Sequence, residues 1–438
     1  MAAAVVSAAA LAAAPAASAA TGPIQSGLGA PTAQKTLRPG VTLSVYTVKV
    51  LDAGVLRTVK IRKIAWQIGN SHVGLQSAVL GSYYTDDYAI GLNRISTWYS
   101  GLAGQSSVAA AINGDFFADD WRHIGAGVPS GMLVHARTIY AFGWGGPAVG
   151  YRPGGDMVMG TPSLRPAAIV LGNGSTATVG AFNGLTTNGV AIHSDQVAAY
   201  VNAGAHVTVP SGYAGYVLPS AVLAQTLRGA RSGYRFSTGA NVSETVAGFR
   251  FAVPGVMHGT ASVPTSQPAE CPTGTCNAGT ALTAPTGGVI LLAKAGGTAA
   301  AGLSARSAAA APLSVATDPS GWGTVNDVMG GKPQLVANGR AITQRPSYVD
   351  SWQWDNAHWR PAVVRAANGQ GWMLVEGGTN GVGVKALTWA RMLVQMGARD
   401  AMGFDNNSST ELFRPGARPL TAYGYERDIT SATYLAYN

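Results

Sequence analysis

Near its C-terminus the chain reads Gly383-Val-Lys-Ala-Leu-Thr-Trp-Ala-Arg-Met-Leu-Val-Gln-Met-Gly397, followed by Ala398-Arg-Asp-Ala-Met-Gly-Phe-Asp405-Asn-Asn-Ser-Ser-Thr410. Apolar residues in the first part recur at helical spacing, at Leu387, Ala390, Leu393 and Val394. Gly397 supplies the left-handed residue with which many helices end. The pattern predicts a helix, a glycine stop, and a short apolar strand that delivers Asp405 into a polar turn.

Asp405 is the first candidate functional residue. It follows Met402 and Phe404, so we expect the sheet to hold its backbone while its side chain enters the loop layer. Binding and catalytic groups concentrate in loops of this kind. A carboxylate that only ties its own turn through backbone N–H groups is the alternative interpretation.

The composition favours a β-rich or mixed protein over a helical bundle. Of 438 residues, 11% are charged and 47% are hydrophobic, and 58 glycines far outnumber 9 phenylalanines. This predicts a core of Ala, Val, Leu and Ile with many tight turns. The net charge of +9 suits contact with anionic polymers, but the basic residues are spread along the chain, so no nucleic-acid partner is predicted.

The N-terminus resembles a secretion signal in composition. Residues 2–19 are almost entirely Ala, Val, Leu and Ser, and Ala17-Ser18-Ala19 has the small-x-small form that signal peptidase cleaves. No Lys or Arg precedes Lys35, so an Ala-rich tail without signal function is the alternative. We predict a signal peptide at 1–20, a flexible leader at 21–40, and a secreted or cell-wall-associated protein without a transmembrane anchor.

The two cysteines, Cys271 and Cys276, are separated by Pro-Thr-Gly-Thr. They are too close to join different elements, and they suit a disulfide that closes one surface loop in an oxidising compartment. A metal site there would need more ligands than the lone His258. Calcium at Asp86-Asp87 or Asp119-Asp120 stays open, beside a plain role for these pairs as solvated faces.

Strand patterns predict the architecture. Val41–Tyr46 and Leu56–Ile68 alternate as a half-buried antiparallel pair does, and Val108–Ile112 reads as a strand that runs into Asn113. Residues 85–103 have a helical pattern. We predict an α+β fold with one large mixed, mostly antiparallel sheet and flanking helices, in a single elaborated domain over 41–438. Surface insertions are expected near 257–285 and 294–312, which are rich in Pro, Thr and Ser and in Ala, Gly and Ser.

Short segments with functional residues follow one another along the chain. They are Asn113-Gly-Asp-Phe-Phe117, Gly127-Val-Pro-Ser-Gly-Met-Leu-Val134, Gly180-Ala-Phe-Asn183, Gly330-Gly-Lys-Pro-Gln-Leu-Val336, Arg360-Pro-Ala362, Val375-Glu-Gly377, Asp405 to Thr410, and Glu426-Arg427-Asp-Ile429. In this order they resemble the phosphodiester glycosidase family over most of the chain after the leader. The resemblance implies a hydrolase that cleaves the bond between a sugar and a phosphodiester, with a glycan or glycosyl-phosphate substrate.

The chain departs from the family pattern at two places. The family usually has Asp-Gly-Gly before a Ser/Thr pair, where this chain has Asp405-Asn406-Asn407. Asn best replaces Gly at positive φ, so the turn is expected to survive while its side chains crowd the ligand. An Asp-Gly-Arg of the family corresponds to Glu376-Gly377-Gly378, which keeps the carboxylate and loses the cation.

The implied reaction needs a cation for the phosphate and carboxyl groups for the acid and base steps. Arg360 is the predicted phosphate anchor, because a guanidinium binds phosphate oxygens in a fork. A surface ion pair or a contact with Trp359 is its alternative role. Asp405 and Glu376 each follow an apolar strand, and we predict that they divide the nucleophile or base and acid roles. The predicted catalytic residues are therefore Asp405, Glu376 and Arg360.

The predicted substrate-binding residues lie in the matched segments and are Asn113, Asp115, Asn183, Ser409 and Thr410. Asn113 is expected to orient substrate hydroxyls or phosphate, with an Asx turn as the alternative. The hydroxyl and N–H groups of Ser409 and Thr410 are expected to form an anion cradle.

Three tryptophans, Trp352, Trp354 and Trp359, precede Arg360. Tryptophan faces stack on sugar rings, so contact with sugar is one interpretation. Alternation of Trp352 and Trp354 equally suits one buried face of a strand.

The sequence supports two functions on one fold. The first is a secreted hydrolase that cleaves glycosyl phosphodiesters in cell-envelope or extracellular glycans. The second is a non-catalytic glycan-binding protein, which the two asparagines after Asp405 and the missing cation favour.

Overall fold

The computed structural model describes residues 22–81, 92–117, 129–135, 138–141, 146–161, 168–170, 176–182, 186–187, 190–200, 206–218, 250–251, 279, 281–283, 289–304, 313–314, 322, 325 and 327–438. Some predictions concern residues outside these ranges. They are the signal peptide at 1–20, Asn183, the Cys271–Cys276 disulfide, the pairs Asp86-Asp87 and Asp119-Asp120, and most of the insertion at 257–285.

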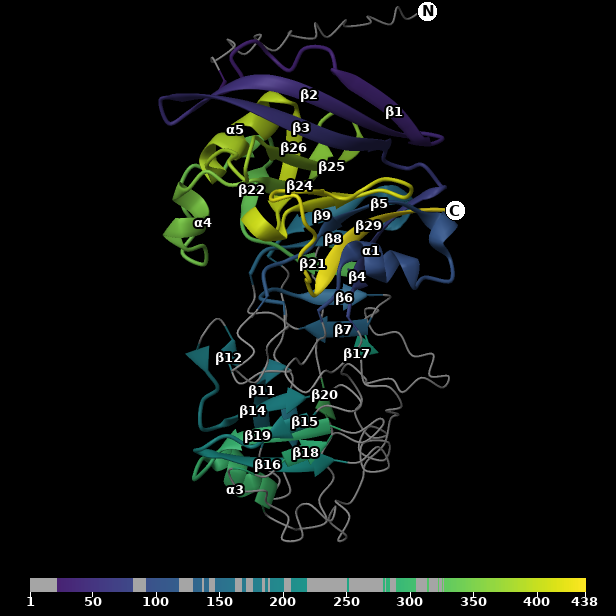
Figure 1. The fold of residues 1–438 in the computed structure, drawn as a ribbon. Helices are drawn as coiled ribbons and strands as arrows, with labels where there is room; N and C mark the ends of the chain where they lie inside the picture. Colours follow the sequence, from purple (N-terminus) through teal and green to yellow (C-terminus); the bar gives the residue numbers. More distant parts are fainter. Residues whose placement is uncertain are drawn as a thin grey trace, which may run out of the picture.

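Antiparallel sheets dominate the described residues (Figure 1). The largest sheet has the strand order β1-β2-β3-β25-β24-β26-β22-β23, and all its neighbouring strands are antiparallel. Its strands are β1 (Ala33–Arg38), β2 (Val41–Asp52), β3 (Val55–Gln67), β22 (Gln334–Ala337), β23 (Arg340–Ala341), β24 (Arg360–Ala366), β25 (Gln370–Gly377) and β26 (Ala398–Gly403). The predicted pairing of the first two alternating segments is confirmed by β2 and β3.

A strand lies within the segment predicted as a flexible leader. Residues 33–38 form β1, which pairs with β2 from Ala33 opposite Val45 to Arg38 opposite Val41. The edge of β2 offers unpaired backbone N–H and C=O groups, and the leader satisfies them by adding a strand. This part of the leader is therefore an edge of the main sheet.

The helix predicted before Gly397 is confirmed as α5 (Ala386–Gln395), and Gly397 has φ 96°. Trp389 and Leu393 of α5 are fully buried and pack on one face of the main sheet, in a core that includes Leu374. The other α-helices are short: α1 (Ile95–Ser100), α3 (Thr298–Ser304) and α4 (Ser351–Asp355). Single turns of 3-10 helix are η1 (Gln105–Ser107), η2 (Pro153–Gly155) and η3 (Asn407–Ser409).

The opposite face of the main sheet packs on a five-stranded sheet of order β28-β27-β5-β29-β4. Its strands are β4 (Val73–Val79), β5 (Val108–Asn113), β27 (Glu411–Phe413), β28 (Leu420–Thr421) and β29 (Ser431–Tyr437). Met373 and Val363 of the main sheet share a buried cluster with Ile112 and Leu435 of the second sheet. This sandwich brings the ends of β26 and β5 together.

Two six-stranded sheets complete the larger architecture. One has the order β17-β7-β6-β21-β8-β9, with β6 (Leu133–His135), β7 (Thr138–Ala141), β8 (Ala148–Tyr151), β9 (Met157–Gly160), β17 (Arg250–Phe251) and β21 (Asp327–Gly330). The other has the order β16-β19-β14-β11-β10-β20, with β10 (Ala168–Val170), β11 (Thr176–Phe182), β14 (Gln196–Tyr200), β16 (Tyr213–Leu218), β19 (Val289–Lys294) and β20 (Leu313–Ser314). Two small ribbons pair β12 (Thr186–Thr187) with β13 (Val190–Ala191) and β15 (His206–Thr208) with β18 (Ala281–Thr283).

The predicted fold class holds only in part. The strands are mostly antiparallel as expected, with parallel pairs at β11–β14 and β17–β7. The prediction of one large sheet with flanking helices is wrong, because the strands divide among several sheets that bury their apolar faces against one another. In Figure 1 the sheet with β11 and β19 lies at the opposite end of the molecule from α5. Among the described residues, no helix is long and apolar enough to cross a membrane.

Candidate functional site

The turn that carries Asp405 is held by the end of a strand from the neighbouring sheet. The Asp405 N–H donates to the Gly114 carbonyl at 3.0 Å, directly after β5. The Asn113 amide donates to the Asp405 carbonyl at 2.7 Å and accepts from the Glu411 N–H at 3.1 Å. Asn113 is buried, and its side chain thereby clamps both ends of the turn. Its contacts position Asp405, and no direct contact with a ligand is needed to explain them.

The backbone conformation of the turn explains why asparagine occupies one of the two positions after Asp405. Asn407 has φ 58°, and its side-chain oxygen accepts a hydrogen bond from the Tyr423 hydroxyl. Asn therefore occupies a left-handed position, as the sequence predicts. Asn406 has φ −105°, an extended conformation that any residue adopts.

Asp405 lies in a cavity of about 380 Å³. The cavity is lined by Phe116, Phe117, Trp352, Gln353, Asp405, Asn406, Asn407, Ser408 and Arg427. Burial raises the pKa of Asp405 to about 7, while a hydrogen bond from Ser409 and the charge of Arg427 oppose this rise. A carboxyl group with such a pKa exchanges protons near neutral pH.

Arg427 supplies a cation beside this carboxyl group. Its Nη1 donates to the Ser409 hydroxyl at 2.9 Å and contacts the Ser408 hydroxyl at 3.3 Å. Its guanidinium lies over the Phe117 ring, 5.3 Å from the centroid. A guanidinium beside hydroxyl groups at a cavity wall is suited to bind a phosphate oxygen.

A second buried carboxyl group, Asp115, interacts electrostatically with Asp405. Burial raises the pKa of Asp115 to about 6, and the charge of Lys332 opposes the rise. Its Oδ2 accepts a hydrogen bond from the Gly131 N–H. A Cβ atom at Gly131 or Gly330 would lie 2.6 or 2.7 Å from this oxygen, so only glycine leaves room for the carboxylate.

Lys332 links the two carboxyl groups. Burial lowers its pKa, while the charges of Asp115, Asp350 and Asp405 raise it. The protonation states of Asp115, Lys332 and Asp405 are therefore coupled, and both carboxyl groups titrate closer to neutral pH than an ordinary aspartate does.

The aromatic wall of the cavity includes Trp352, which is 52% exposed. The His358 ring packs 4.3 Å from it, and His358 Nε2 lies 3.3 Å from the Trp352 carbonyl. Trp354 and Trp359 are buried in the core. The core interpretation therefore applies to Trp354 and Trp359, whereas the exposed side chain of Trp352 lines the cavity.

Arg360 and Glu376 lie opposite each other on β24 and β25. The Arg360 guanidinium donates to the carbonyl groups of Val384, Gln353 and Asn356 at 2.7–2.8 Å. Neither residue lines the cavity that contains Asp405. Burial lowers the pKa of Arg360 and raises the pKa of Glu376, and the attraction between their charges opposes both shifts. The structure thus places this predicted pair apart from the Asp405 cavity.

The two hydroxyl residues of the predicted anion cradle, Ser409 and Thr410, form hydrogen bonds with different parts of the structure. Ser409 contacts Asp405 and Arg427, whereas the Thr410 hydroxyl donates to the Trp359 carbonyl at 3.0 Å. Both side chains are buried. Of the predicted site residues, the structure therefore groups Asp405, Asp115 and Ser409, with Asn113 behind them.

Sequence reasoning missed Arg427 and Lys332 as site residues. Both lie in segments that resemble the family, Glu426-Arg427-Asp-Ile429 and Gly330-Gly-Lys332-Pro-Gln334. Lys332 is a cation directly after two glycines, a signal that could have nominated it, whereas Arg427 stands between Glu426 and Asp428 and reads locally as part of a charged surface segment. Among the described residues, no group of three or more His, Cys, Asp or Glu side chains is arranged to hold a metal ion.

Structural comparison places the chain among known folds. A hypothetical protein from Synechocystis matches with a TM-score of 0.61 and 16% identity over 91% of this chain, which spans 62% of that protein's length. A candidate exported protein from Burkholderia pseudomallei matches with a TM-score of 0.52 and 16% identity, over 88% of this chain and 75% of that one. At these identities the matches show a shared fold.

A third solved structure is the catalytic domain of zebrafish N-acetylglucosamine-1-phosphodiester alpha-N-acetylglucosaminidase, auto-inhibited by its pro-peptide. It has a TM-score of 0.41 and 9% identity, over 93% of this chain and 87% of that one. No curated protein sequence matches significantly. The family model of the phosphodiester glycosidases matches residues 260–436, the part of the chain that contains Lys332, Asp405 and Arg427.

Proposed function

We propose that this protein is a hydrolase of glycosyl phosphodiesters and that the Asp405 cavity is its active site. The observation that carries the proposal is the pairing, in one cavity, of a buried carboxyl group with Arg427. The family match over residues 260–436 supports glycosidase-type hydrolysis, and the N-terminal composition supports an extracellular or cell-envelope substrate.

Different cavity residues bind the phosphate, bind the sugar and donate the proton. Arg427 and the Ser408 hydroxyl bind the phosphate, and the exposed face of Trp352 stacks on the sugar ring. Bound phosphate adds negative charge near Asp405, which favours the protonated form of a carboxyl group whose pKa is already about 7. Protonated Asp405 donates its proton to the bridging oxygen as the bond to the anomeric carbon breaks. Water then adds to that carbon and gives up a proton to the Asp405 carboxylate, which restores the acid.

Asp115 and Lys332 act from behind the cavity wall. The Lys332 charge favours the ionised form of Asp115, and the Asp115 charge in return raises the pKa of Lys332. The Lys332 charge in turn limits the rise in the pKa of Asp405, because it attracts the ionised form.

The decisive experiment is Asp405→Asn, assayed by release of reducing sugar from a panel of sugar-1-phosphate diesters. We expect kcat to fall by about 10² to 10⁴, the usual contribution of a positioned general acid. The matched control is Asp355→Asn, an exposed carboxyl on α4, which should leave kcat unchanged. Circular dichroism and thermal melting establish that both variants are folded.

The second candidate function, a glycan-binding protein without catalysis, is separated by the same panel. If the wild-type protein binds the diesters with no release of sugar from any of them, the hydrolase proposal is wrong. Equal activity of Asp405→Asn and wild type would remove Asp405 from the chemistry.

A further inference from the structure

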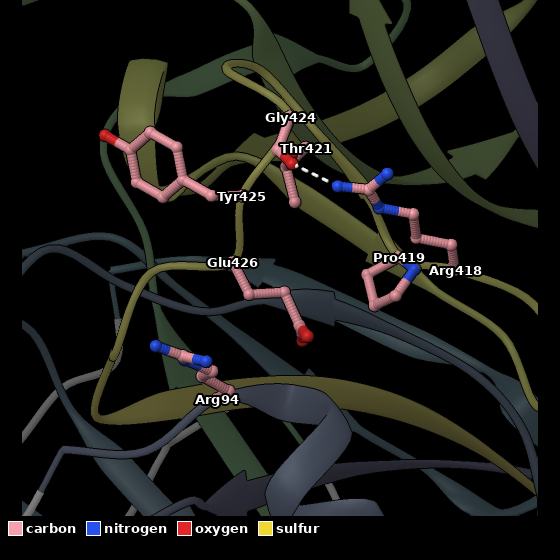
Figure 2. Close-up of a pocket in the computed structure, with 7 residues that line it drawn as sticks. All are labelled: Arg94, Arg418, Pro419, Thr421, Gly424, Tyr425 and Glu426. Atoms are coloured by element: carbon pink, nitrogen blue, oxygen red, sulfur yellow. Dashed lines mark hydrogen bonds between the residues drawn. The ribbon is translucent and has the colours of Figure 1, made fainter.

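A second cavity, of about 300 Å³, is lined in part by the segment that precedes Arg427 (Figure 2). It is lined by Arg94, Arg418, Pro419, Thr421, Gly424, Tyr425 and Glu426. Glu426 and Arg427 are consecutive, yet one lines this cavity and the other lines the Asp405 cavity. The two cavities therefore share one stretch of backbone as a common wall.

The polar groups of this second cavity form a balanced mixture of donors and acceptors. Arg94 contacts Asp428 at 3.4 Å, and Glu426 accepts hydrogen bonds from the backbone N–H and the hydroxyl of Ser96 at 3.1 and 2.5 Å. The Arg418 Nη2 donates to the Gly424 carbonyl at 2.7 Å, which leaves its other N–H groups for a ligand. Figure 2 shows the Glu426 carboxylate directed into the space between Arg94 and Pro419.

The charge balance argues against a site for an anion. The carboxylates of Glu426 and Asp428 offset the two arginines, so a phosphate would gain little net attraction. Glu411, buried nearby, interacts with Glu426, Asp428 and Arg94, and burial together with these acidic neighbours raises its pKa to about 9. It remains a neutral carboxyl group at physiological pH and adds no negative charge that would favour a cation.

An exposed aromatic ring borders the same cavity. Tyr425 is 58% exposed and stacks with Tyr423 at a centroid distance of 6.3 Å. In Figure 2 Tyr425 and Arg418 lie on opposite sides of Gly424. The cavity thus offers an aromatic ring on one side of Gly424 and charged donor and acceptor groups on the other, which suit the apolar face and the hydroxyl groups of a sugar ring.

We propose that the Arg418–Tyr425–Glu426 cavity is a second saccharide-binding subsite, which takes an uncharged pyranose ring. Its role in catalysis rests on the proposed function: the ring belongs to the part of the substrate beyond the phosphate, so the substrate is an oligosaccharide or polysaccharide diester. Tyr423 joins the two cavities, because its hydroxyl bonds Asn407 while its ring stacks on Tyr425. A chain bound across this wall occupies both cavities.

The catalytic test compares two diesters with the same scissile bond, one with a small alcohol beyond the phosphate and one with a neutral trisaccharide there. Wild type should prefer the longer substrate by about tenfold or more in kcat/KM. This is the effect expected when the extra sugar ring gains one stacking contact together with its hydrogen bonds. Tyr425→Ala should remove most of this preference and leave kcat/KM on the short diester unchanged. Leu56→Ala, an exposed apolar residue on the β2–β3 hairpin, is the matched control and should retain the preference.

A binding test is independent of turnover. Isothermal titration calorimetry with neutral oligosaccharides should give binding to Asp405→Asn that weakens at least about tenfold in Asp405→Asn/Tyr425→Ala, and similarly in Asp405→Asn/Arg94→Ala. Equal binding by the single and double variants overturns the saccharide subsite. The subsite is also overturned if Arg418→Ala weakens the binding of inorganic phosphate more than it weakens the binding of the oligosaccharide. If oligosaccharide binding depends on Tyr425 while no diester is cleaved, the subsite stands and the proposed hydrolase activity fails.

Discussion

Asn407 shows how a single residue sets the shape of the candidate active site. Its φ of 58° is strained for most residues with a Cβ, and Asn tolerates it through local polar contacts. Here the contact is the hydrogen bond from the Tyr423 hydroxyl. The asparagine thus preserves the turn of Asp405 and also ties it to the segment that carries Arg427.

We expect Asn407→Gly to keep the turn, because glycine adopts positive φ without steric cost. Asn407→Val should destabilise the protein by about 1–3 kcal/mol, since a β-branched residue is strained at this φ. Urea denaturation of both variants measures the difference. Asn406→Val is the matched control, because the extended backbone at Asn406 accepts a β-branched residue. Equal stability of the two Asn407 variants would contradict the strain argument.

The pH dependence of the proposed reaction follows from Asp405. Its pKa of about 7 means that the protonated form, the proton donor, is lost as the pH rises through that value. We expect kcat/KM to fall about tenfold per pH unit above about pH 7. Measurement of kcat/KM from pH 5 to 9 tests this, and Asp405→Asn should lack this alkaline limb. An activity that rises through pH 7 would assign Asp405 the role of base.

Among the elements, Arg360 holds the short helix α4 in place. Its guanidinium donates to the Gln353 carbonyl in the middle of α4, to the Asn356 carbonyl at the C-cap of α4, and to the Val384 carbonyl before α5. The five-residue α4 is capped by Asp350, whose side chain accepts from the Gln353 N–H at 2.7 Å. These bonds set the position of Trp352 and Gln353 at the cavity wall.

Arg360→Ala should therefore cost about 3–5 kcal/mol of stability, because it leaves Glu376 buried without its partner and three carbonyl groups without donors. Chemical denaturation measures the loss, and Arg391→Ala on the exposed face of α5 is the control. A variant with unchanged stability and a selective loss of phosphate-dependent activity would instead support the phosphate-anchor role predicted from the sequence.

At the scale of the whole molecule, buried acids couple stability to pH. Burial raises the pKa values of Asp115, Asp405 and Glu411 to about 6, 7 and 9, from ordinary values of 3.8, 3.8 and 4.5. At a pH between the ordinary pKa and the raised pKa of each group, the folded chain binds more protons than the unfolded chain. The free energy of unfolding therefore falls as the pH rises through this range. His358, whose pKa burial lowers from 6.5, opposes this trend below that pH.

We expect the urea midpoint to decrease from pH 5 through pH 7 to pH 9. Glu411→Gln should reduce the slope between pH 7 and 9, because the amide cannot ionise and its folded environment already favours a neutral group. A midpoint that rises over this range would mean that these carboxyl groups are ionised in the folded protein.

The local elements around the site follow from patterns in the amino-acid sequence. Helical spacing predicted α5, Gly397 predicted its end, and alternation predicted the β2–β3 pair, because each pattern reflects the geometry of neighbouring residues on one backbone. The same local reasoning placed Asp405 at the end of a strand and identified Asn as a residue for positive φ.

The side chains that meet Asp405 are selected by long-range packing. Asn113 is 292 positions away from it, and Arg427 comes from a segment beyond two further strands. Arg360 looked equally suited to bind phosphate, but packing gives its guanidinium three backbone carbonyls instead. Partners so distant in sequence are chosen by how sheets pack and by which buried polar groups need hydrogen bonds, and neither is encoded in local periodicity.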